Sequence, residues 1–196
     1  DFPFLPDFVI VREREIFFPG QFGRWVPDES WNKKCEKDHS RLFRKCKRAL
    51  AKIKDHVEAN TNARWVSVEG DAAGIVSSTE EEMDDILRII ENLTLHSDLT
   101  FERNSIYLRF SHRAYRKGSC LQEAAKRWGL ECDKILAIGD NHNDLSMLQP
   151  EICEACGCPA NAIQEVRDYV TERGGKVAAN PGSIGVMEVM KHYFDQ

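Results

Sequence analysis

One stretch constrains the fold of this chain more than any other: the run 134–138, which reads Lys-Ile-Leu-Ala-Ile. A strand with apolar residues on both faces is typical of a parallel sheet that helices cover on both sides. The segments around this run alternate between helical and strand patterns, as such a sheet requires. Helices are expected at 117–128, 144–148, 162–168 and 184–194, and further strands at 154–158 and 169–170. The pattern therefore predicts half of a doubly wound α/β domain.

The earlier part of the chain follows a different pattern. Strands are expected in pairs, at 7–12 and 15–18, at 64–69 and 74–78, and at 99–103 and 105–110, with a loop at 20–27. A long amphipathic helix begins at Ser30, and a short one follows the capping box of Thr79 and Glu82. This ββ-α-ββ-α-ββ order predicts an antiparallel sheet covered by two helices. We therefore expect an α+β subdomain over 1–112 and the α/β domain over 113–196.

The composition argues against several classes of protein. The formal net charge is -5 in a chain of 196 residues, which does not suit a general nucleic-acid binder. No apolar run approaches the roughly 20 residues that a membrane helix needs, and the N-terminus lacks the pattern of a secretory signal. The seven cysteines are scattered and odd in number, which fits reduced thiols. A cytoplasmic protein without nucleic-acid or membrane partners is expected.

The residues that carry chemistry are concentrated at 139–144, directly after the apolar run, and read Gly-Asp-Asn-His-Asn-Asp. Ligands of open α/β sheets bind outside the carboxyl ends of the strands, which is where Asp140 lies. Asp144 follows at the expected start of the next helix. Magnesium takes oxygen ligands and is usually held by a few carboxylates and phosphate oxygens. Asp140 and Asp144 are therefore candidate ligands of a magnesium ion.

A phosphate group at the same place would need hydrogen-bond donors and a fixed positive charge. Asn143 offers a neutral amide to a phosphate oxygen, and the helix expected after it directs backbone N–H groups toward the loop. Lys117 opens the helix that precedes the apolar strand. A lone lysine would mean nothing. The combination of a Lys-Gly helix start, an apolar strand and Gly-Asp-x-x-Asn-Asp is more specific.

These segments resemble motifs of the haloacid dehalogenase superfamily. Lys117-Gly118 and the segment 139–144 look like its third and fourth motifs. The segment 158–162 is similar to the one in which an Asn-Ala pair opens the next core helix, and 182–186 resembles the Gly-Val at the start of the last helix. The strands and helices before Lys117 look like the large cap of the Cof and sucrose-phosphatase branch. The resemblance implies a partial core of this family, with the cap over 1–112.

The resemblance implies magnesium-dependent hydrolysis of a phosphate monoester through an aspartyl-phosphate. It makes Asp140 a magnesium ligand, and Asp144 an outer-shell ligand or the residue that orients Lys117. Lys117 would bind the phosphate and the nucleophile, and Asn143 would bind the phosphate. The implied substrate is a small phosphorylated metabolite such as a sugar phosphate, with its specificity set by the cap.

The nucleophile that the resemblance requires is not found in this sequence. The family carries it in an Asp-x-Asp-x-Thr-like motif at the end of the first core strand, before the cap. Asp1 and Asp7 lie in a stretch rich in Phe and Pro, and the segment 69–74 lacks the Asp-x-Asp pair. Without the absent strand, the run 134–138 would have an open edge. The chain does not begin with Met, and we expect a preceding segment of the same protein to carry the nucleophile.

Several other features have two interpretations. His142 acts near the leaving group, or it is a loop residue without a catalytic role. The Cys-x-x-Cys-x-Cys at 153–158 has a spacing known from zinc sites, but without a second ligand cluster buried thiols are the simpler interpretation. The basic face of the helix after Ser30 is solvated or binds anions. The aromatic loop 22–31 lines the substrate side of the cap or anchors the loop. Four residues near Lys117 would suit an anionic substrate: Arg109, His112, Arg113 and Arg116.

Three hypotheses for the function remain. The first is a phosphatase with a large α/β cap. The second is a catalytically silent protein on the same scaffold that binds a phosphorylated ligand or regulates a partner. The third is a phosphomutase, which uses the same site. An Asp-x-Asp motif upstream in the gene would favour an enzyme over a silent protein, and product analysis would separate the phosphatase from the mutase.

Overall fold

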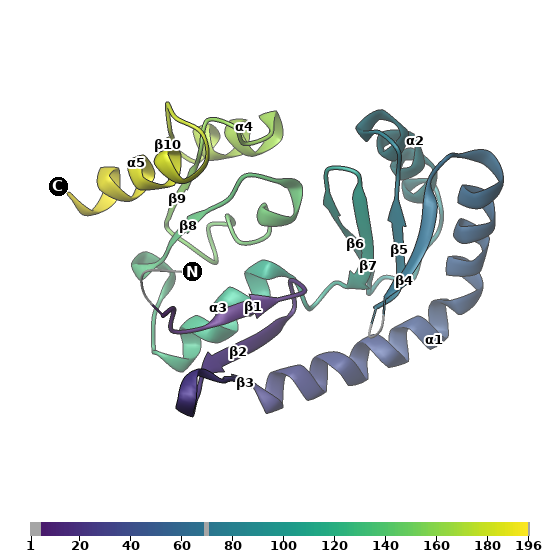
Figure 1. The fold of residues 1–196 in the computed structure, drawn as a ribbon, viewed down its shortest axis with the longest axis horizontal. Coiled ribbons are helices and arrows are strands. Elements are labelled where there is room, and N and C mark those ends of the chain that lie inside the picture. Colours follow the sequence, from purple (N-terminus) through teal and green to yellow (C-terminus); the bar gives the residue numbers. More distant parts are fainter. Residues whose placement is uncertain (1–4, 69–70, 196) are drawn as a thin grey trace. The chain divides into compact units, whose positions relative to one another are not determined.

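The computed structural model describes residues 5–68 and 71–195, and it divides the chain into two compact units (Figure 1). One unit combines the residues up to Asn32 with those from Arg116 onward, and the other is Lys33–Tyr115. Helices and sheets are mixed in the molecule, so the predicted α/β class is confirmed. The structure places the first 32 residues in the same unit as the C-terminal part, whereas the sequence pattern predicts that they belong to the subdomain 1–112. The assignment of the units to a core and a cap stays a prediction.

The unit Lys33–Tyr115 is built on a four-stranded antiparallel sheet. Its strands are β4 (Arg64–Val68), β5 (Asp71–Val76), β6 (Leu99–Asn104) and β7 (Tyr107–His112), in the order β4-β5-β7-β6. Both strand pairs expected in this region are confirmed, and the pairing of β5 with β7 joins them. The second strand begins earlier than expected, at Asp71, and the last residue of the first expected strand, 69, lies outside the described residues.

One hydrophobic cluster holds the two helices of this unit, α1 (Glu29–Asn60) and α2 (Glu80–Glu91), against its sheet. Along α1 the buried residues recur every three or four positions from Leu42 to Val57, so a single apolar stripe faces the strands. The cluster also contains Met83, Ile86 and Ile90 of α2 and Ile75, Leu108 and Phe110 of the strands. Among the described residues, no helix is both long and apolar enough to cross a membrane.

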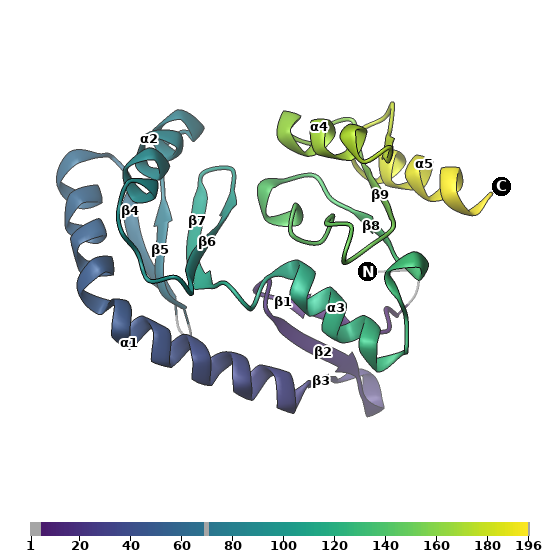
Figure 2. The ribbon, with the colours of Figure 1, turned by 180° about the vertical axis from the view of Figure 1, so that it is seen from behind.

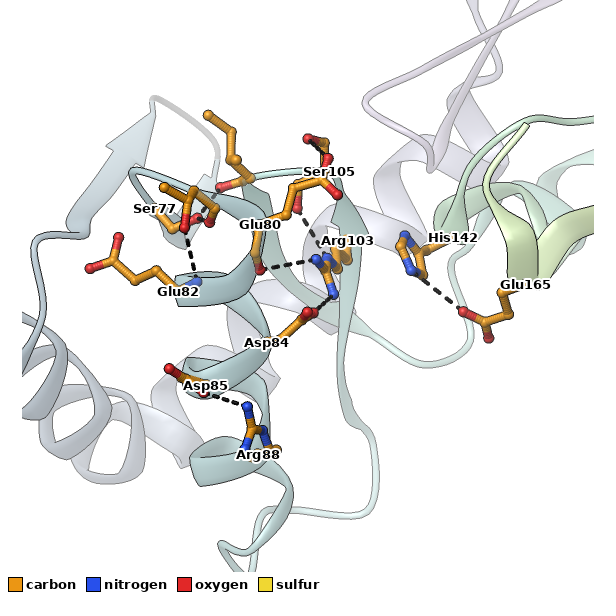
Figure 3. Close-up of polar contacts among 12 residues, drawn as sticks. Ser77, Glu80, Glu82, Asp84, Asp85, Arg88, Arg103, Ser105, His142 and Glu165 are labelled. Carbon is orange, nitrogen blue, oxygen red and sulfur yellow. Dashed lines mark hydrogen bonds and ion pairs between the residues drawn. The ribbon is translucent and has the colours of Figure 1, made fainter. Parts of the chain in front are cut away.

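Polar side chains fix the start of α2, and some of these contacts are drawn in Figure 3. The Thr79 hydroxyl accepts a hydrogen bond from the backbone N–H of Glu82 at 3.2 Å. The Glu82 carboxylate accepts one from the backbone N–H of Ser78 at 2.7 Å. The predicted N-cap Thr79 is therefore confirmed, while the Glu82 carboxylate binds the residue before the cap, Ser78, where a capping box would bind Thr79 itself. Arg103 of β6 pairs with Asp84, which ties the helix to the edge of the sheet.

The first strands of the chain form a sheet of their own, so the expectation that they share the antiparallel sheet of 64–110 is wrong. The strands β1 (Val9–Val11), β2 (Glu15–Pro19) and β3 (Trp25–Pro27) are antiparallel in this order. In Figure 2, α3 (Lys117–Arg127) lies along β1 and β2, which it contacts. The third strand and a short 3₁₀ helix, η1 (Gln21–Gly23), occupy the expected loop. Pro27 ends the strand at a sheet edge, where its missing N–H is tolerated.

The predicted parallel sheet is present and has three described strands. These are β8 (Leu136–Ile138), β9 (Ala155–Cys158) and β10 (Lys176–Val177), in the order β10-β9-β8 (Figure 1). The helices α4 (Gln164–Glu172) and α5 (Gly182–Phe194) contact β9 and β10. A further 3₁₀ turn, η2 (Cys132–Lys134), precedes β8. The strand that leads to the predicted site is therefore at the edge of the described sheet, with β9 beside it.

The prediction of a helix at 144–148 is wrong. The structure has a 3₁₀ helix, η3 (His142–Asp144), followed by turns. The reason lies in Asp144, whose carboxylate accepts hydrogen bonds from backbone N–H groups that precede it. These contacts bend the segment into a compact loop, and side chains of this type commonly compete with helical hydrogen bonding in this way.

The prediction of a strand at 169–170 is also wrong, because these residues belong to α4. Val166 and Val170 are fully buried one helical turn apart, so both face the same core. The last strand comes later, after Gly174, whose positive φ of 69° turns the chain out of the helix.

Candidate active site at the end of β8

Lys117 and Asp144, two predicted site residues that lie far apart in the sequence, are in direct contact. Lys117 is the first residue of α3, and its Nζ donates a hydrogen bond to Oδ1 of Asp144 at 2.5 Å. The other oxygen, Oδ2, accepts hydrogen bonds from the backbone N–H groups of Asp140 at 2.9 Å and Asn141 at 3.1 Å. The Asp144 side chain is only 7% exposed. A charge-assisted bond with further backbone donors thus holds the ammonium group in place.

Two glycines allow this contact. A Cβ on Gly139 would lie 2.4 Å from Cβ of Asp144, so only glycine lets that side chain fold back over the end of β8. A Cβ on Gly118 would lie 2.0 Å from the carbonyl oxygen of Ser146. The start of α3 therefore packs directly against the loop after η3. Close packing therefore explains why both the Lys-Gly pair and the Gly-Asp pair contain a glycine.

Asp140 follows Gly139 at the end of β8 and is exposed. Desolvation by the protein around it, and next the nearby charge of Asp144, raise the pKa of its carboxyl. Two carboxylates beside one lysine leave negative charge that a cation would compensate. Magnesium is often held by one or two carboxylates, with water and phosphate oxygens completing its shell. Since Asp144 is engaged by Lys117, the residues fit a magnesium ion held chiefly by Asp140.

Asn143 is buried in the same loop and contacts a residue that the sequence analysis did not identify. Its Nδ2 donates to Oε1 of Glu13 at 2.5 Å, and the residue is 3% exposed. Its Oδ1 is buried and has no hydrogen-bond partner among the described residues. Glu13 lies in the turn between β1 and β2, 130 positions earlier in the chain. No local pattern in the sequence connects the two residues.

His142 is tied to neighbouring side chains. Its Nδ1 lies 3.0 Å from Oδ1 of Asn141. Its Nε2 lies 3.4 Å from Oε2 of Glu165 in α4, a pair drawn in Figure 3. These contacts favour an anchoring role in the loop over a catalytic one.

The cysteines at 153–158 pack into the core of the α/β unit. Cys153, Cys156 and Cys158 are 0%, 1% and 0% exposed, and burial raises the pKa of all three thiols. Arg173 contacts the Cys153 sulfur at 3.5 Å. Throughout 5–68 and 71–195, no three His, Cys, Asp or Glu side chains gather as metal ligands. The burial of the three thiols fits the interpretation as small apolar side chains.

The remaining candidates are distributed over both units. Arg109, His112 and Arg113 belong to the unit Lys33–Tyr115, whereas Arg116 belongs to the other. Arg113 donates to the carbonyl oxygen of Ser97 at 2.9 Å. The aromatic loop 22–31 lies entirely in the unit that contains β8, and the Trp31 indole N–H donates to the carbonyl oxygen of Arg14 at 2.8 Å. An anion-binding role for the four cationic residues and a substrate role for the loop stay predictions.

A family model described as haloacid dehalogenase-like hydrolase matches residues 7–181. Because this match covers most of the chain, the protein belongs to the haloacid dehalogenase-like hydrolases. A curated relative, a phosphoglycolate phosphatase from Thermoplasma acidophilum, is 38% identical over 64 residues. That match covers 31% of this chain and 28% of the relative's length.

Solved structures show the same fold at low sequence identity. The sucrose-phosphatase from Synechocystis, solved with sucrose and phosphate, matches with a TM-score of 0.70 at 16% identity, over 96% of this chain and 75% of that one. A haloacid dehalogenase-like hydrolase from Bacillus subtilis matches with a TM-score of 0.56 at 16% identity, over 98% and 70%. A Thermoplasma acidophilum structure matches with a TM-score of 0.51 at 20% identity, over 74% and 60%. The matched part of this chain thus corresponds to less than two thirds of the length of the phosphoglycolate phosphatase and of the Thermoplasma acidophilum structure.

Proposed function

We propose that this protein is a magnesium-dependent phosphatase for a small phosphorylated metabolite, acting in the cytoplasm. The observation that carries the proposal is the contact of Lys117 with Asp144, which fixes a cation at the carboxyl end of β8 beside the exposed Asp140. Fixed cations at such a place stabilise the charge of a transferring phosphoryl group. Relatives named phosphoglycolate phosphatase and sucrose-phosphatase support a phosphorylated acid or sugar as the substrate class.

Each of the four site residues has a distinct role in the proposed reaction. Lys117 binds a phosphate oxygen, and Asp144 keeps its ammonium from rotating away. Asn143 contributes an amide hydrogen bond to the phosphate. Asp140 would hold the magnesium ion, which when bound would neutralise charge on the phosphate group.

The attacking carboxylate is not among these residues. We propose that it comes from a segment of the same protein that adds a strand beside β8. The support for this is the sheet order, in which β8 is the edge strand of the described sheet. An apolar strand left at an edge is prone to pair with another chain, so a covering strand would also protect it.

A phosphatase screen tests the proposal. Phosphate release from sugar phosphates and phosphoglycolate is measured with the natural product of the gene and with the present chain, in magnesium and in excess chelator. We expect turnover by the gene product in magnesium only, and negligible turnover by the present chain. Absence of turnover across the series, together with absence of phosphate binding, would contradict the proposal. Phosphate binding without turnover would favour the silent ligand-binding protein, and transfer of phosphate within the substrate would identify a mutase.

A further inference from the structure

Glu13 lies outside every predicted motif, yet the structure brings its carboxylate to the candidate site. The residue sits in the turn that joins β1 to β2, where the N–H of Arg14 donates to the carbonyl oxygen of Val11 at 3.2 Å. Arg12 and Glu13 both have positive φ, of 51° and 65°. Such turns usually contain Gly, Asn or Asp, because other side chains are strained there. Strain of this kind persists only where the surroundings impose it, and it is often found at functional sites.

Two contacts hold the turn against the site. The Cys120 thiol of α3 donates to the carbonyl oxygen of Glu13 at 3.7 Å, which fixes the backbone. The Glu13 carboxylate accepts the 2.5 Å hydrogen bond from Nδ2 of Asn143. A carboxylate of this kind can only accept hydrogen bonds. Glu13 therefore decides which end of the Asn143 amide faces the turn.

The other end of the amide is then fixed as well. Oδ1 of Asn143 is buried without a partner among the described residues, which costs free energy unless a ligand supplies a donor. The second N–H of Nδ2 remains for an acceptor such as a phosphate oxygen. We propose that Glu13 is a positioning residue of the phosphate site, which holds the Asn143 amide in its binding orientation. This inference rests on the proposed function of the site.

A carboxylate near a phosphate site has a second, opposite effect, because like charges repel. Removing Glu13 therefore weakens phosphate binding through the freed amide and strengthens it through the lost charge. Two substitutions separate these effects. Glu13→Gln and Glu13→Ala both remove the charge, but only Gln keeps an oxygen that can accept from Asn143. A difference between the two variants that also requires Asn143 reports on the hydrogen bond.

The experiment measures the affinity for inorganic phosphate by calorimetric titration in magnesium, using the natural gene product. We expect E13Q to bind phosphate at least about threefold more tightly than E13A, since a freed amide spends only part of its time in the binding orientation. In an Asn143→Ala background the difference should disappear, and Asn143→Ser serves if that variant does not fold. Glu15→Ala is the matched control, because Glu15 lies in the same hairpin and pairs with Arg12 at 3.6 Å.

Urea unfolding of the same variants gives an independent readout. If the contact exists, the shifts of the unfolding midpoint for E13A and for the Asn143 variant will not add in the double variant. Equal phosphate affinities of E13Q and E13A, or a difference that persists without Asn143, would overturn the positioning role. If the unmodified protein binds no phosphate while the midpoints show coupling, the contact is real but the proposed function fails, and the positioning role fails with it.

Discussion

Different kinds of contact stabilise the interior of each of the two units. In Lys33–Tyr115 a single cluster of large aliphatic and aromatic side chains joins two helices to four strands. In the unit that contains β8 the cluster is made largely of cysteine, alanine and valine. Its loop 139–148, which contains the proposed site, is shaped by hydrogen bonds between side chains and the backbone. Apolar burial therefore builds the first unit, whereas polar contacts shape the candidate site in the second.

The largest expected effect tests the apolar side of this comparison. Phe110 of β7 is 1% exposed, and Phe110→Ala should lower the free energy of unfolding by about 3–5 kcal/mol, because it leaves a cavity. Val189→Ala in α5, at a position that is also fully buried, should cost about 2 kcal/mol. Both values come from urea titrations followed by circular dichroism. A larger loss for V189A than for F110A would break the comparison.

The next effect concerns the site. Lys117→Met should reduce phosphatase turnover by the gene product at least about 10²-fold, because the charge that Asp144 holds in place is lost. Lys126→Met is the control, since Lys126 is exposed in the same helix and has no described role at the site. Steady-state kinetics provides the measurement. Near-normal turnover of K117M would remove the Lys117–Asp144 contact from the mechanism.

Close backbone packing gives a smaller effect. Gly118→Ala places a Cβ against the carbonyl oxygen of Ser146 and should destabilise the protein by about 1–3 kcal/mol while also lowering turnover. Gly129→Ala, beyond the other end of α3, strains a φ of 63° but meets no neighbouring atom. We expect it to cost about 1 kcal/mol without a change in kcat. Equal turnover of the two variants would show that the approach of α3 to the loop does not serve the site.

The elements of Lys33–Tyr115 are the ones that the sequence predicts best. Local periodicity predicts the long amphipathic helix α1, most of which lies in this unit, and the N-cap Thr79 places the start of α2. The two secondary-structure predictions that are wrong, a helix at 144–148 and a strand at 169–170, fall in the other unit. There the outcome depends on contacts such as those of Asp144 with backbone N–H groups, which no local pattern reveals.

The same distinction holds for the site. The Lys-Gly and Gly-Asp pairs are visible in the sequence as motifs, and the close packing of Gly118 and Gly139 explains both glycines. The contact of Glu13 with Asn143 is not predictable, because it depends on how the β1–β2 turn meets a loop 130 residues later. Tertiary contacts of this length leave no periodic signal in one sequence.

The smallest expected effect lies in the unit without predicted site motifs. Tyr115 donates a hydrogen bond to Asp38 at 2.7 Å, and this bond is the main reason why the pKa of Asp38 is lowered. A lowered folded-state pKa stabilises the protein above the unfolded-state pKa of about 3.9, and the gain is lost as the pH falls through the folded-state value. Tyr115→Phe should therefore cost at most about 1 kcal/mol at pH 7, since Asp38 is partly exposed.

The same variant should cost less at pH 3 than at pH 7, because the pH then approaches the lowered pKa of Asp38, and a protonated carboxyl accepts a weaker hydrogen bond. Urea titrations at both pH values measure the difference between Y115F and the unmodified protein. A cost that does not change with pH would show that the bond does not depend on the charge of Asp38.

We propose that the carboxyl end of β8 is a magnesium and phosphate site built on Asp140, Lys117 and Asp144. Calorimetric titration of magnesium, with and without inorganic phosphate, tests it most directly, with Asp140→Asn as the comparison. We expect magnesium and phosphate to strengthen each other's binding by the same factor, and this coupling to be lost in D140N. Magnesium binding that is unaffected by both phosphate and the D140N substitution would contradict the account.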